Sequence, residues 1–343
     1  MDTLGSTDQT PPRLSVIVPV RDGARYLPQS LAALRASDLD AGLWELIVVD
    51  DASRDGSAEV AGPFADIVAR RDVTNGPSAA RNHGVRQSHG DLLVFVDADV
   101  SVHADALRRL ARAFDREDVA AVFGSYDAWP SAAGLVSQYR NLLHHWVHAE
   151  AGGEAETFWA GLGAIRRRVF TAAGAFDETM PQLEDIDLGY RVRALGHRIL
   201  LLPEIQGTHL KRWTLLGMVR TDLFGRGVTW MRLHLEQGRA GRPGTLNLRP
   251  GEKVYTILAA FAVFAAAMAV LGRHLSWLIA AGVCLAGVVV GNLPLFRWFA
   301  RVRGVRFAVL VVPLRVLYYL LNAIAAPIGL LYHLVSPRHR IAR

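Results

Sequence analysis

The stretch LLVFVDADV, residues 92–100, places two carboxylates directly after a run of apolar side chains. The apolar run has the length and composition of a buried strand. Successive side chains of a strand point to opposite faces, so Asp97 and Asp99 share one face and Ala98 takes the other. Two carboxylates this close repel each other. A hard divalent cation held with substrate phosphates, a neighbouring arginine, or solvation on a loop would offset the repulsion.

Other apolar runs of strand length occur on both sides of this stretch. They cover residues 14–20, 45–50 and 119–125, with a weaker run at 66–71. The runs are continuous rather than alternating, which is typical of strands that are covered on both faces. Helical patterns lie between and after them, at residues 26–36, 77–88, 104–115, 132–149 and 183–195. This alternation predicts an α/β doubly wound half with a mostly parallel sheet from residue 14 to about residue 100.

The chain changes character after residue 253. Residues 254–271 and 275–296 contain no charged side chain, and each segment is about long enough to cross a bilayer. A third segment, 307–335, includes Arg315 and two prolines, so we expect it to span, to be re-entrant or to lie at the interface. Four arginines between residues 297 and 306 place that side in the cytoplasm. We therefore predict a multi-pass protein of the inner (cytoplasmic) membrane with a cytoplasmic N-terminal domain.

Composition excludes some classes of protein. The single cysteine, Cys284, rules out an internal disulfide and a thiolate metal cluster. The net charge of +6 is concentrated around the apolar segments, as at a membrane surface, and no basic patch is interleaved with aromatics. We therefore expect a membrane partner and no nucleic acid. The predicted divisions are a disordered lead-in (1–13), a domain (14–235), a linker or membrane-surface segment (236–253), a membrane region (254–335) and a basic tail (336–343).

Polar clusters close the predicted strands, where open α/β sheets bind their ligands. They are VPVRDG at 18–23, VVDDASRDGS at 48–57, NGPSAARNHG at 75–84 and the opening stretch. A carboxylate after the second strand can accept from a ribose hydroxyl or a base N–H, and Arg81 can face phosphate. Singly, each cluster also has a plainer interpretation, because a DxD is often a solvated loop and a DD a helix cap.

Together and in this order, the clusters resemble those of the family 2 glycosyltransferases, which have the Rossmann-like GT-A fold. The second half matches as well, with GLGAIRRRVFTAAGAFDE at 161–178, LEDIDLGYRVRALGHRI at 183–199, and His209. The resemblance covers residues 14–235 and implies transfer of a sugar from a nucleotide-sugar donor. One departure is Asp22, where the family often has asparagine. This difference alters either a contact to the nucleotide or only a loop hydrogen bond.

The resemblance also implies roles for particular residues. Asp99 would ligate Mg²⁺ or Mn²⁺, with Asp97 beside it toward ribose or metal, and His209 would face the metal or be an ordinary loop histidine. Asp51 would recognise the base, with Asp50 in support. The implied donor-binding residues are Pro19, Val20, Asp22, Asp50, Asp51, Arg81 and Asp97. The implied acceptor-side residues are Trp159, Gly161 and Gly163.

The dipeptide formed by Glu184 and Asp185 has two interpretations. An acidic first turn complements the helix dipole, which contributes a few tenths of a kcal/mol up to ~1 kcal/mol. Matched to the family's ED motif, Asp185 is implied as the general base that deprotonates the acceptor hydroxyl, with Glu184 beside it. Residues 212–230 are basic and amphipathic, and they suit a membrane-surface helix above the site.

The leading hypothesis is an inverting, metal-dependent glycosyltransferase that acts on a lipid-linked or cell-envelope glycan acceptor. A polyprenyl-phosphate glycosyltransferase is the nearest rival, and its phosphate acceptor needs no base. A processive synthase usually has more spans and a QxxRW motif, which this sequence lacks. A non-catalytic scaffold of a polysaccharide assembly complex and a nucleotidyltransferase that releases pyrophosphate remain as alternatives.

Overall fold

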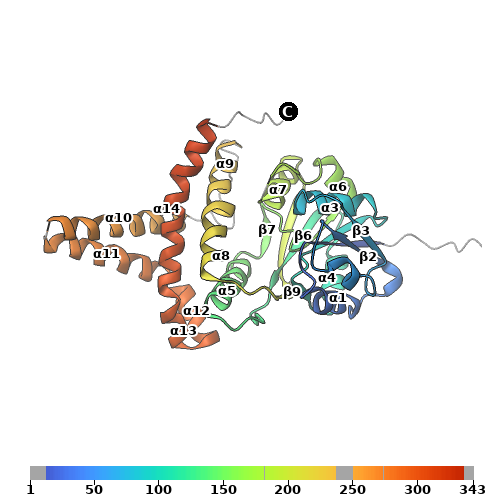
Figure 1. The fold of residues 1–343 in the computed structure, drawn as a ribbon, viewed down its shortest axis with the longest axis horizontal. Helices are drawn as coiled ribbons and strands as arrows, with labels where there is room; N and C mark the ends of the chain where they lie inside the picture. The colour runs from blue at the N-terminus through green and yellow to red at the C-terminus, as the bar shows by residue number, and fades with distance from the viewer. Residues whose placement is uncertain (1–12, 181, 237–249, 273, 336–343) are drawn as a thin grey trace, which may run out of the picture.

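A computed structural model of the chain describes residues 13–180, 182–236, 250–272 and 274–335. Its N-terminal part is a sheet with helices on both faces (Figure 1). The strands are β1 (Leu14–Val20), β2 (Trp44–Asp50), β3 (Ile67–Arg70), β4 (Leu92–Val96), β5 (Val100–Val102), β6 (Val119–Tyr126), β7 (Gly153–Ala155), β8 (Leu162–Arg166) and β9 (Arg198–His209). The helices of this part are α1 (Leu27–Arg35), α2 (Ser57–Ala61), α3 (Pro77–Arg86), α4 (Ala106–Ala113), α5 (Leu135–Ala149), α6 (Arg167–Ala172) and α7 (Glu184–Ala194).

The sheet has the strand order β3-β2-β1-β4-β8-β6-β9-β5, with β7 paired to β9. Strands β3, β2, β1 and β4 are parallel, which confirms the predicted doubly wound half. Strand β8 is antiparallel to both of its neighbours, β4 and β6, so the second half of the sheet is mixed. An apolar run gives the presence of a strand but not its direction, which explains why the sequence did not separate the two halves.

Continuous burial explains the continuous apolar runs. Successive residues Val16 and Ile17 of β1 are both fully buried, yet they belong to cores on opposite faces of the sheet. Helices α1 and α4 contribute to the first core, and α6 and α7 contribute to the second. Helix α3 approaches the sheet closely at Gly84, where an added Cβ would lie 2.5 Å from the Ile17 side chain. Because β1, β2 and β4 are parallel, their carboxyl ends and the N-terminus of α3 meet at one edge.

The C-terminal part is helical. A continuous segment comprises α8 (Leu215–Arg220), the π-helix η2 (Thr221–Val228) and α9 (Thr229–Glu236). The remaining helices are α10 (Pro250–Gly272), α11 (Leu275–Gly291), α12 (Leu293–Arg303), α13 (Val305–Leu310) and α14 (Val312–Val335). Two helical stretches, Gly251–Gly272 and Val305–Val335, are long and apolar enough to cross a membrane. Helices α11 and α12 provide a third only if the two, bent by 61°, count as one span.

The predicted span at residues 275–296 contains a break, so it is not one straight helix. Helix α11 ends at Gly291, and the Asn292 side chain donates to the Val288 carbonyl at 2.8 Å. Pro294, which has no N–H, stands in the first turn of α12 and favours a new helix start. The predicted linker also ends earlier than expected, since α10 begins at Pro250. The predicted lead-in and tail, and the linker between residues 237 and 249, lie outside the described residues, apart from residue 13.

Helix α14 lies between the α10–α11 hairpin and the α8–η2–α9 segment, and it runs across the hairpin (Figure 1). A buried polar contact fixes this crossing. Arg315 of α14 donates to Glu252 of α10 at 2.7 Å and to Asn292 at the α11–α12 bend at 2.8 Å. Partnered in this way, an arginine is tolerated among apolar helices. Helix α14 thus contacts both the membrane-type hairpin and the helices that lie against the α/β domain.

Candidate active site

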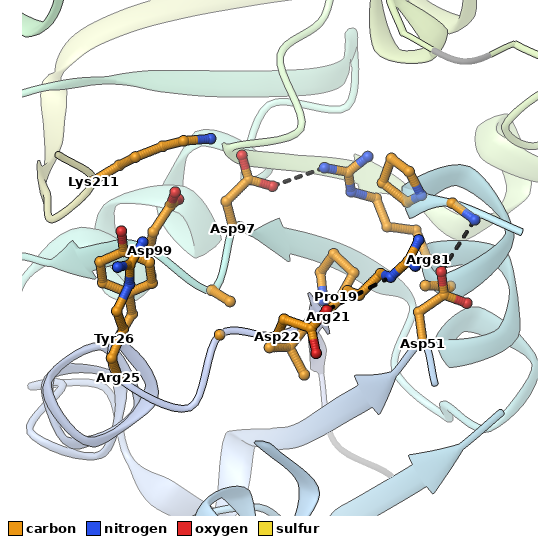
Figure 2. A pocket seen from close by; sticks show the side chains of 16 residues that line it. Pro19, Arg21, Asp22, Arg25, Tyr26, Asp51, Arg81, Asp97, Asp99 and Lys211 are labelled. Carbon is orange, nitrogen blue, oxygen red and sulfur yellow. Dashed lines mark hydrogen bonds and ion pairs between the residues drawn. The ribbon is translucent and has the colours of Figure 1, made fainter. Parts of the chain in front are cut away.

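A cleft of about 420 Å³ opens where the parallel strands end (Figure 2). Asp51 lies at one end of it, and Asp99 and Lys211 lie at the other. The predicted residues that line it are Pro19, Val20, Asp22, Asp51, Arg81, Asp97 and Asp99. The lining also includes Arg21, Arg25, Tyr26 and Lys211, which the sequence did not single out. Cationic side chains along a cleft with carboxylates at both ends suit a ligand that carries phosphates.

A guanidinium and an imidazole face the carboxylates of the opening stretch. Arg81 of α3 donates to Asp97 at 2.7 Å, and the His209 ring nitrogen Nε2 lies 3.5 Å from Asp99. Burial raises the pKa of Asp97, against the opposing charge of Arg81. Burial also acts to raise the pKa of Asp99, but the hydrogen bond and charge of His209 and the charge of Lys211 outweigh it and lower that pKa. Asp99 is therefore held ionised at the mouth of the cleft.

His209 is held in place by two neighbours. Its Nδ1 atom donates to Asn141 Oδ1 at 2.5 Å, and its ring stacks on Tyr126 with centroids 4.3 Å apart. The hydrogen bond to Asn141 orients the ring so that Nε2 faces Asp99. Strand β9 places the histidine there because Val100 of β5 pairs with it across the sheet. The arrangement is more specific than that of a loop histidine.

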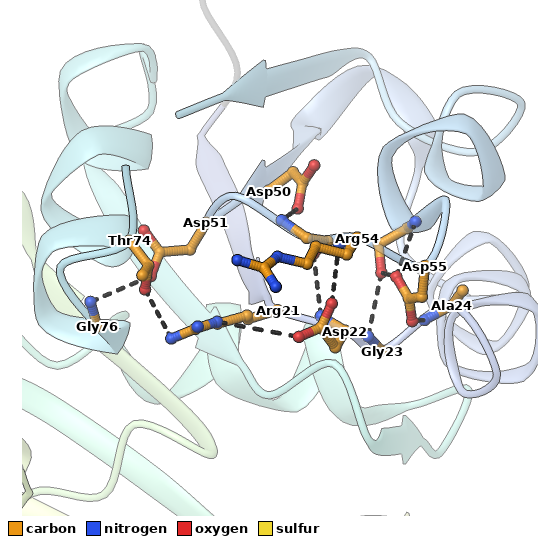
Figure 3. A network of polar contacts seen from close by, with 12 residues as sticks. Arg21, Asp22, Gly23, Ala24, Asp50, Asp51, Arg54, Asp55, Thr74 and Gly76 are labelled. Atoms are coloured by element: carbon orange, nitrogen blue, oxygen red, sulfur yellow. Dashed lines mark hydrogen bonds and ion pairs between the residues drawn. The ribbon is translucent and has the colours of Figure 1, made fainter. Parts of the chain in front are cut away.

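The opposite end of the cleft is organised around Asp51, which is 3% exposed (Figure 3). Its carboxylate accepts from the Thr74 hydroxyl at 2.7 Å and from the Gly76 N–H at 3.0 Å. Asp50 does not line the cleft and instead accepts from the Ser53 N–H at 3.0 Å. Asp50 thus shapes the loop after β2, while Asp51 stands at the cleft wall.

Asp22 adopts a left-handed backbone conformation, with φ of 50°. Asparagine and aspartate are the residues that enter this region most readily after glycine. The Asp22 carboxylate accepts from the Arg54 N–H at 2.8 Å, and the Asp22 N–H donates to Ser53 (Figure 3). The departure from asparagine therefore bears on a loop hydrogen bond that an aspartate makes equally well.

Arg81 links the two acidic motifs. It is 5% exposed, and besides Asp97 it donates to Glu184 at 2.6 Å. Glu184 is therefore directed at Arg81. Arg81 lines the cleft, but both branches of its guanidinium are engaged by carboxylates. This ion-paired position differs from that of a free phosphate-binding arginine, and it fixes α7 against the opening stretch.

Asp185, the next residue, lies in the first turn of α7 beside the loop that contains Trp159 and Gly161. Its carboxylate accepts from the Ala160 N–H at 3.1 Å and from the Ile186 N–H at 2.8 Å. Burial raises the pKa of Asp185 to about 7, the negative charge of Glu184 adds to the rise, and Arg81 opposes it. A carboxylate with a pKa near neutral is suited to taking up a proton during a reaction.

The predicted acceptor-side residues are packed so tightly that glycine is required. A Cβ at Gly161 would lie 2.4 Å from the Trp159 ring, and one at Gly163 would lie 2.4 Å from the Trp159 carbonyl oxygen. The Gly161 carbonyl accepts from the Asp97 N–H at 3.1 Å, which joins this loop to the opening stretch. Trp159 packs edge-on against Tyr126, with centroids 4.9 Å apart. These contacts place the loop between Asp97 and Asp185.

Comparison with known proteins identifies the domain. Residues 15–171 match the family described as "Glycosyl transferase family 2". Residues 15–171 therefore form a glycosyltransferase family 2 domain. Glycosyltransferase AglE of Haloferax volcanii is 26% identical over 209 residues, covering 59% of this chain and 68% of AglE. The undecaprenyl-phosphate 4-deoxy-4-formamido-L-arabinose transferase of Pseudomonas aeruginosa is 32% identical over 175 residues, covering 46% of this chain and 48% of that protein.

The fold of this glycosyltransferase also occurs in a solved structure. Mannosyltransferase PcManGT from Pyrobaculum calidifontis, solved with GDP-Man and Mn²⁺, superposes with a TM-score of 0.58 at 19% identity. The likeness covers 97% of this chain and 91% of PcManGT, so it extends beyond the α/β domain into the C-terminal helices. The predicted α/β GT-A fold, followed by helices apolar enough to span a membrane, is confirmed.

The candidate metal ligands of the glycosyltransferase suit a divalent cation. Within the described ranges, no group of three or more His, Cys, Asp or Glu side chains is arranged to hold a metal. Mg²⁺ is usually held by one or two carboxylates together with substrate phosphates, so such a cage is not required. Asp99 offers an ionised carboxylate at the cleft, with Asp97 and the imidazole of His209 beside it. Oxygen and imidazole ligands of this kind suit Mg²⁺ or Mn²⁺.

Some residues of the glycosyltransferase site were missed from the sequence. Lys211 had a detectable signal, since it is one of two lysines and lies two positions after His209. Tyr126 and His144 meet Trp159 only through packing, with His144 and Trp159 centroids 4.7 Å apart. Burial, together with the charge of His148, lowers the pKa of His144 well below its usual value, so this ring is neutral at pH 7. No spacing in the sequence predicts that aromatic cluster.

Proposed function

We propose that the chain is an inverting, metal-dependent glycosyltransferase that moves a sugar from a nucleotide-sugar donor to a lipid-linked or cell-envelope glycan acceptor. The observation that carries this proposal is the link between the two acidic motifs. Arg81 joins Asp97 at the donor cleft to Glu184, the neighbour of Asp185, so a metal-type carboxylate pair and a proton acceptor belong to one site. The apolar C-terminal helices support a membrane location, and the four arginines between residues 297 and 306 support a site on the cytoplasmic side.

The donor would lie along the cleft between its two acidic ends. Asp51, fixed by Thr74 and Gly76, has the position and chemistry to accept a hydrogen bond from a base. Asp99, with Asp97 and His209, would hold Mg²⁺ or Mn²⁺. When bound, the ion supplies charge stabilisation for the departing diphosphate. The mannosyltransferase PcManGT, solved with GDP-Man and Mn²⁺, supports this class of donor and cofactor.

Asp185 would take the proton of the acceptor hydroxyl as it attacks the sugar. An inverting displacement needs this base on the side of the sugar opposite the leaving diphosphate. The Ala160 and Ile186 N–H groups orient the carboxylate, and the charge of Glu184 adds to its proton affinity. Trp159, with Gly161 and Gly163 packed against it, belongs to the loop whose Ala160 N–H contacts this carboxylate.

Transfer to a polyprenyl phosphate is the second candidate. The Pseudomonas relative, by its name, acts with undecaprenyl phosphate, which favours this candidate. A phosphate oxygen is already ionised and needs no base, so Asp185 would matter little for turnover. The effect of replacing Asp185 therefore distinguishes the two acceptors.

A thermal-shift panel of nucleotide sugars on the full chain in detergent, with and without Mn²⁺, tests the proposal. A true donor at 100 times its dissociation constant should add ~2.7 kcal/mol of stability. The stabilisation should require Mn²⁺ or Mg²⁺, and turnover should release a nucleoside diphosphate. The proposal fails if no nucleotide sugar stabilises the chain with either metal, or if pyrophosphate is the product.

A further inference from the structure

Arg226 lies on the π-helix η2, which is wedged between the active site and α14. A Cβ at Gly225 would lie 2.3 Å from the Gln182 side chain, just before α7. A Cβ at Gly227 would lie 2.5 Å from Ala325 of α14. The residue between these two glycines is therefore held where the ED motif and the membrane-type helices meet. π-Helical turns of this kind are frequent at functional sites.

The charges around Arg226 do not balance. Asp222, four residues earlier, is buried and paired with Arg140 at 2.6 and 3.0 Å through both carboxylate oxygens. Arg226 itself is exposed and forms no ion pair with any residue in the described part of the chain. Asp222 is fully engaged by Arg140, which leaves the positive charge of Arg226 uncompensated.

The electrostatic neighbours of Arg226 locate it beside the acceptor side of the site. Its guanidinium interacts with Arg140, Asp222, Tyr126 and Asp185. The charge of Arg140 lowers the pKa of Arg226 to about 10, so it remains charged at pH 7. Asp185, whose pKa is about 7, is only partly ionised there and compensates the cation weakly. An accessible guanidinium held next to a second one is a favourable partner for a phosphate group.

Apolar side chains on the same helical segment indicate what carries that phosphate. Leu216 is 78% exposed and Phe224 is 59% exposed, and both lie within α8 and η2. Helix α14, packed against η2, exposes further apolar side chains such as Ile328. A free phosphate ion would leave this surface uncovered, whereas a lipid phosphate places its chain along it.

We propose that Arg226 binds the phosphate group of a membrane-lipid acceptor and so brings that acceptor to Asp185. The buried Arg140–Asp222 pair holds η2 in place and adds a second positive charge behind Arg226. This assignment rests on the proposed glycosyltransferase function and specifies the chemistry of its acceptor. The lipid carries either a monophosphate that is itself glycosylated, or a diphosphate-linked glycan whose hydroxyl group is glycosylated.

Binding of short isoprenoid phosphates to the full chain in phosphatidylcholine nanodiscs tests the assignment. The probes are farnesyl phosphate, farnesyl diphosphate and uncharged farnesol. Because a hydrogen bond to a charged group contributes about 1.5–3 kcal/mol, Arg226→Gln should weaken phosphate binding by about 10- to 150-fold. Arg226→Lys keeps the positive charge but lacks the planar guanidinium, so its phosphate affinity should lie between those of the wild type and Arg226→Gln. Farnesol binding should not depend on Arg226.

The matched control is Arg220→Gln, which removes one exposed positive charge six residues earlier on the same helical segment. It should change phosphate binding by no more than about twofold, because exposed charges contribute little. Equal losses in the Arg226 and Arg220 variants, or farnesol binding as tight as that of the phosphates, would overturn the assignment. A preference for the monophosphate or the diphosphate identifies which of the two lipid sources is used.

Nucleotide-sugar binding, measured on the same samples, distinguishes an error in the Arg226 assignment from an error in the proposed function. Arg226→Gln should keep the wild-type thermal shift with donor and Mn²⁺, which also shows that the variant is folded. If the wild-type chain binds donor but phosphate binding is independent of Arg226, this assignment alone is wrong. If the wild-type chain binds no donor, the proposed function itself is wrong.

Discussion

Replacing Asp185 with asparagine is the sharpest test of the proposed chemistry. Asp185 accepts two backbone hydrogen bonds, from Ala160 and Ile186. Asparagine has a single acceptor oxygen, so one N–H loses its partner at a cost of about 1 kcal/mol in stability. The amide cannot take up a proton, and loss of general-base catalysis lowers turnover by ~10²–10⁴-fold, or about 2.7–5.5 kcal/mol in the barrier. The expected rise in the activation barrier thus exceeds the expected loss of folding stability.

The assay is transfer from the best donor of the thermal-shift panel to a glycan acceptor, at saturating Mn²⁺. Both kcat and kcat/KM should fall together, since the interaction is made in the transition state, while donor affinity stays near wild type. Asp177→Asn makes the same acid-to-amide change in the loop before α7, where Asp177 contacts Thr179, and should leave turnover unchanged. An Asp185→Asn variant with more than about half the wild-type rate refutes the base assignment and favours a phosphate acceptor.

Four further results are expected. In the pH profile of kcat/KM, the acidic limb should lie near pH 7, because Asp185 must be deprotonated to act. Glu184→Gln should move this limb to lower pH, because the negative charge of Glu184 raises the pKa of Asp185. A profile that is flat from pH 5.5 to 8 contradicts the base role. Asp99→Ala should abolish Mn²⁺-dependent donor binding in calorimetry while the unfolding temperature is retained, and unchanged affinity excludes the metal role. Arg81→Met leaves the buried carboxylate of Glu184 and the partly exposed carboxylate of Asp97 without their shared cation, which should cost about 3–5 kcal/mol at pH 7. Burial already raises the pKa of Asp97, and losing the charge of Arg81 raises it further, so the loss of stability should shrink at pH 5. Equal losses in thermal unfolding at both pH values argue against this role of Arg81. The full chain should resist carbonate extraction from membranes because α10 and α14 are apolar throughout most of their length, and its appearance in the supernatant rules out the anchor.

Local sequence patterns determined the parallel half of the fold and one end of the site. Runs such as residues 14–20 are apolar at every position because both faces of β1 are buried. Polar clusters just after such runs must lie at the carboxyl edge of the sheet, which is why Asp51, Asp97 and Asp99 were predicted and do line one cleft. Each of these inferences uses neighbouring residues only, and hydrophobic periodicity reports local geometry directly.

The tertiary structure alone decided the contacts between distant segments. Arg81 and Glu184 are 103 positions apart, and no spacing in the chain indicates that they form an ion pair. The antiparallel direction of β8, the bend at Asn292 and the unpaired charge of Arg226 likewise depend on which elements pack together. The sequence by itself indicated strands β1, β2, β3, β4 and β6, the segments apolar enough for a membrane, and the carboxylates that follow strands, but it did not indicate β5, β7 or β9. Packing of the whole chain decided which of those charges are neutralised. The strength of an ion pair depends on the distance between the two charges in space, and separation along the sequence does not determine that distance.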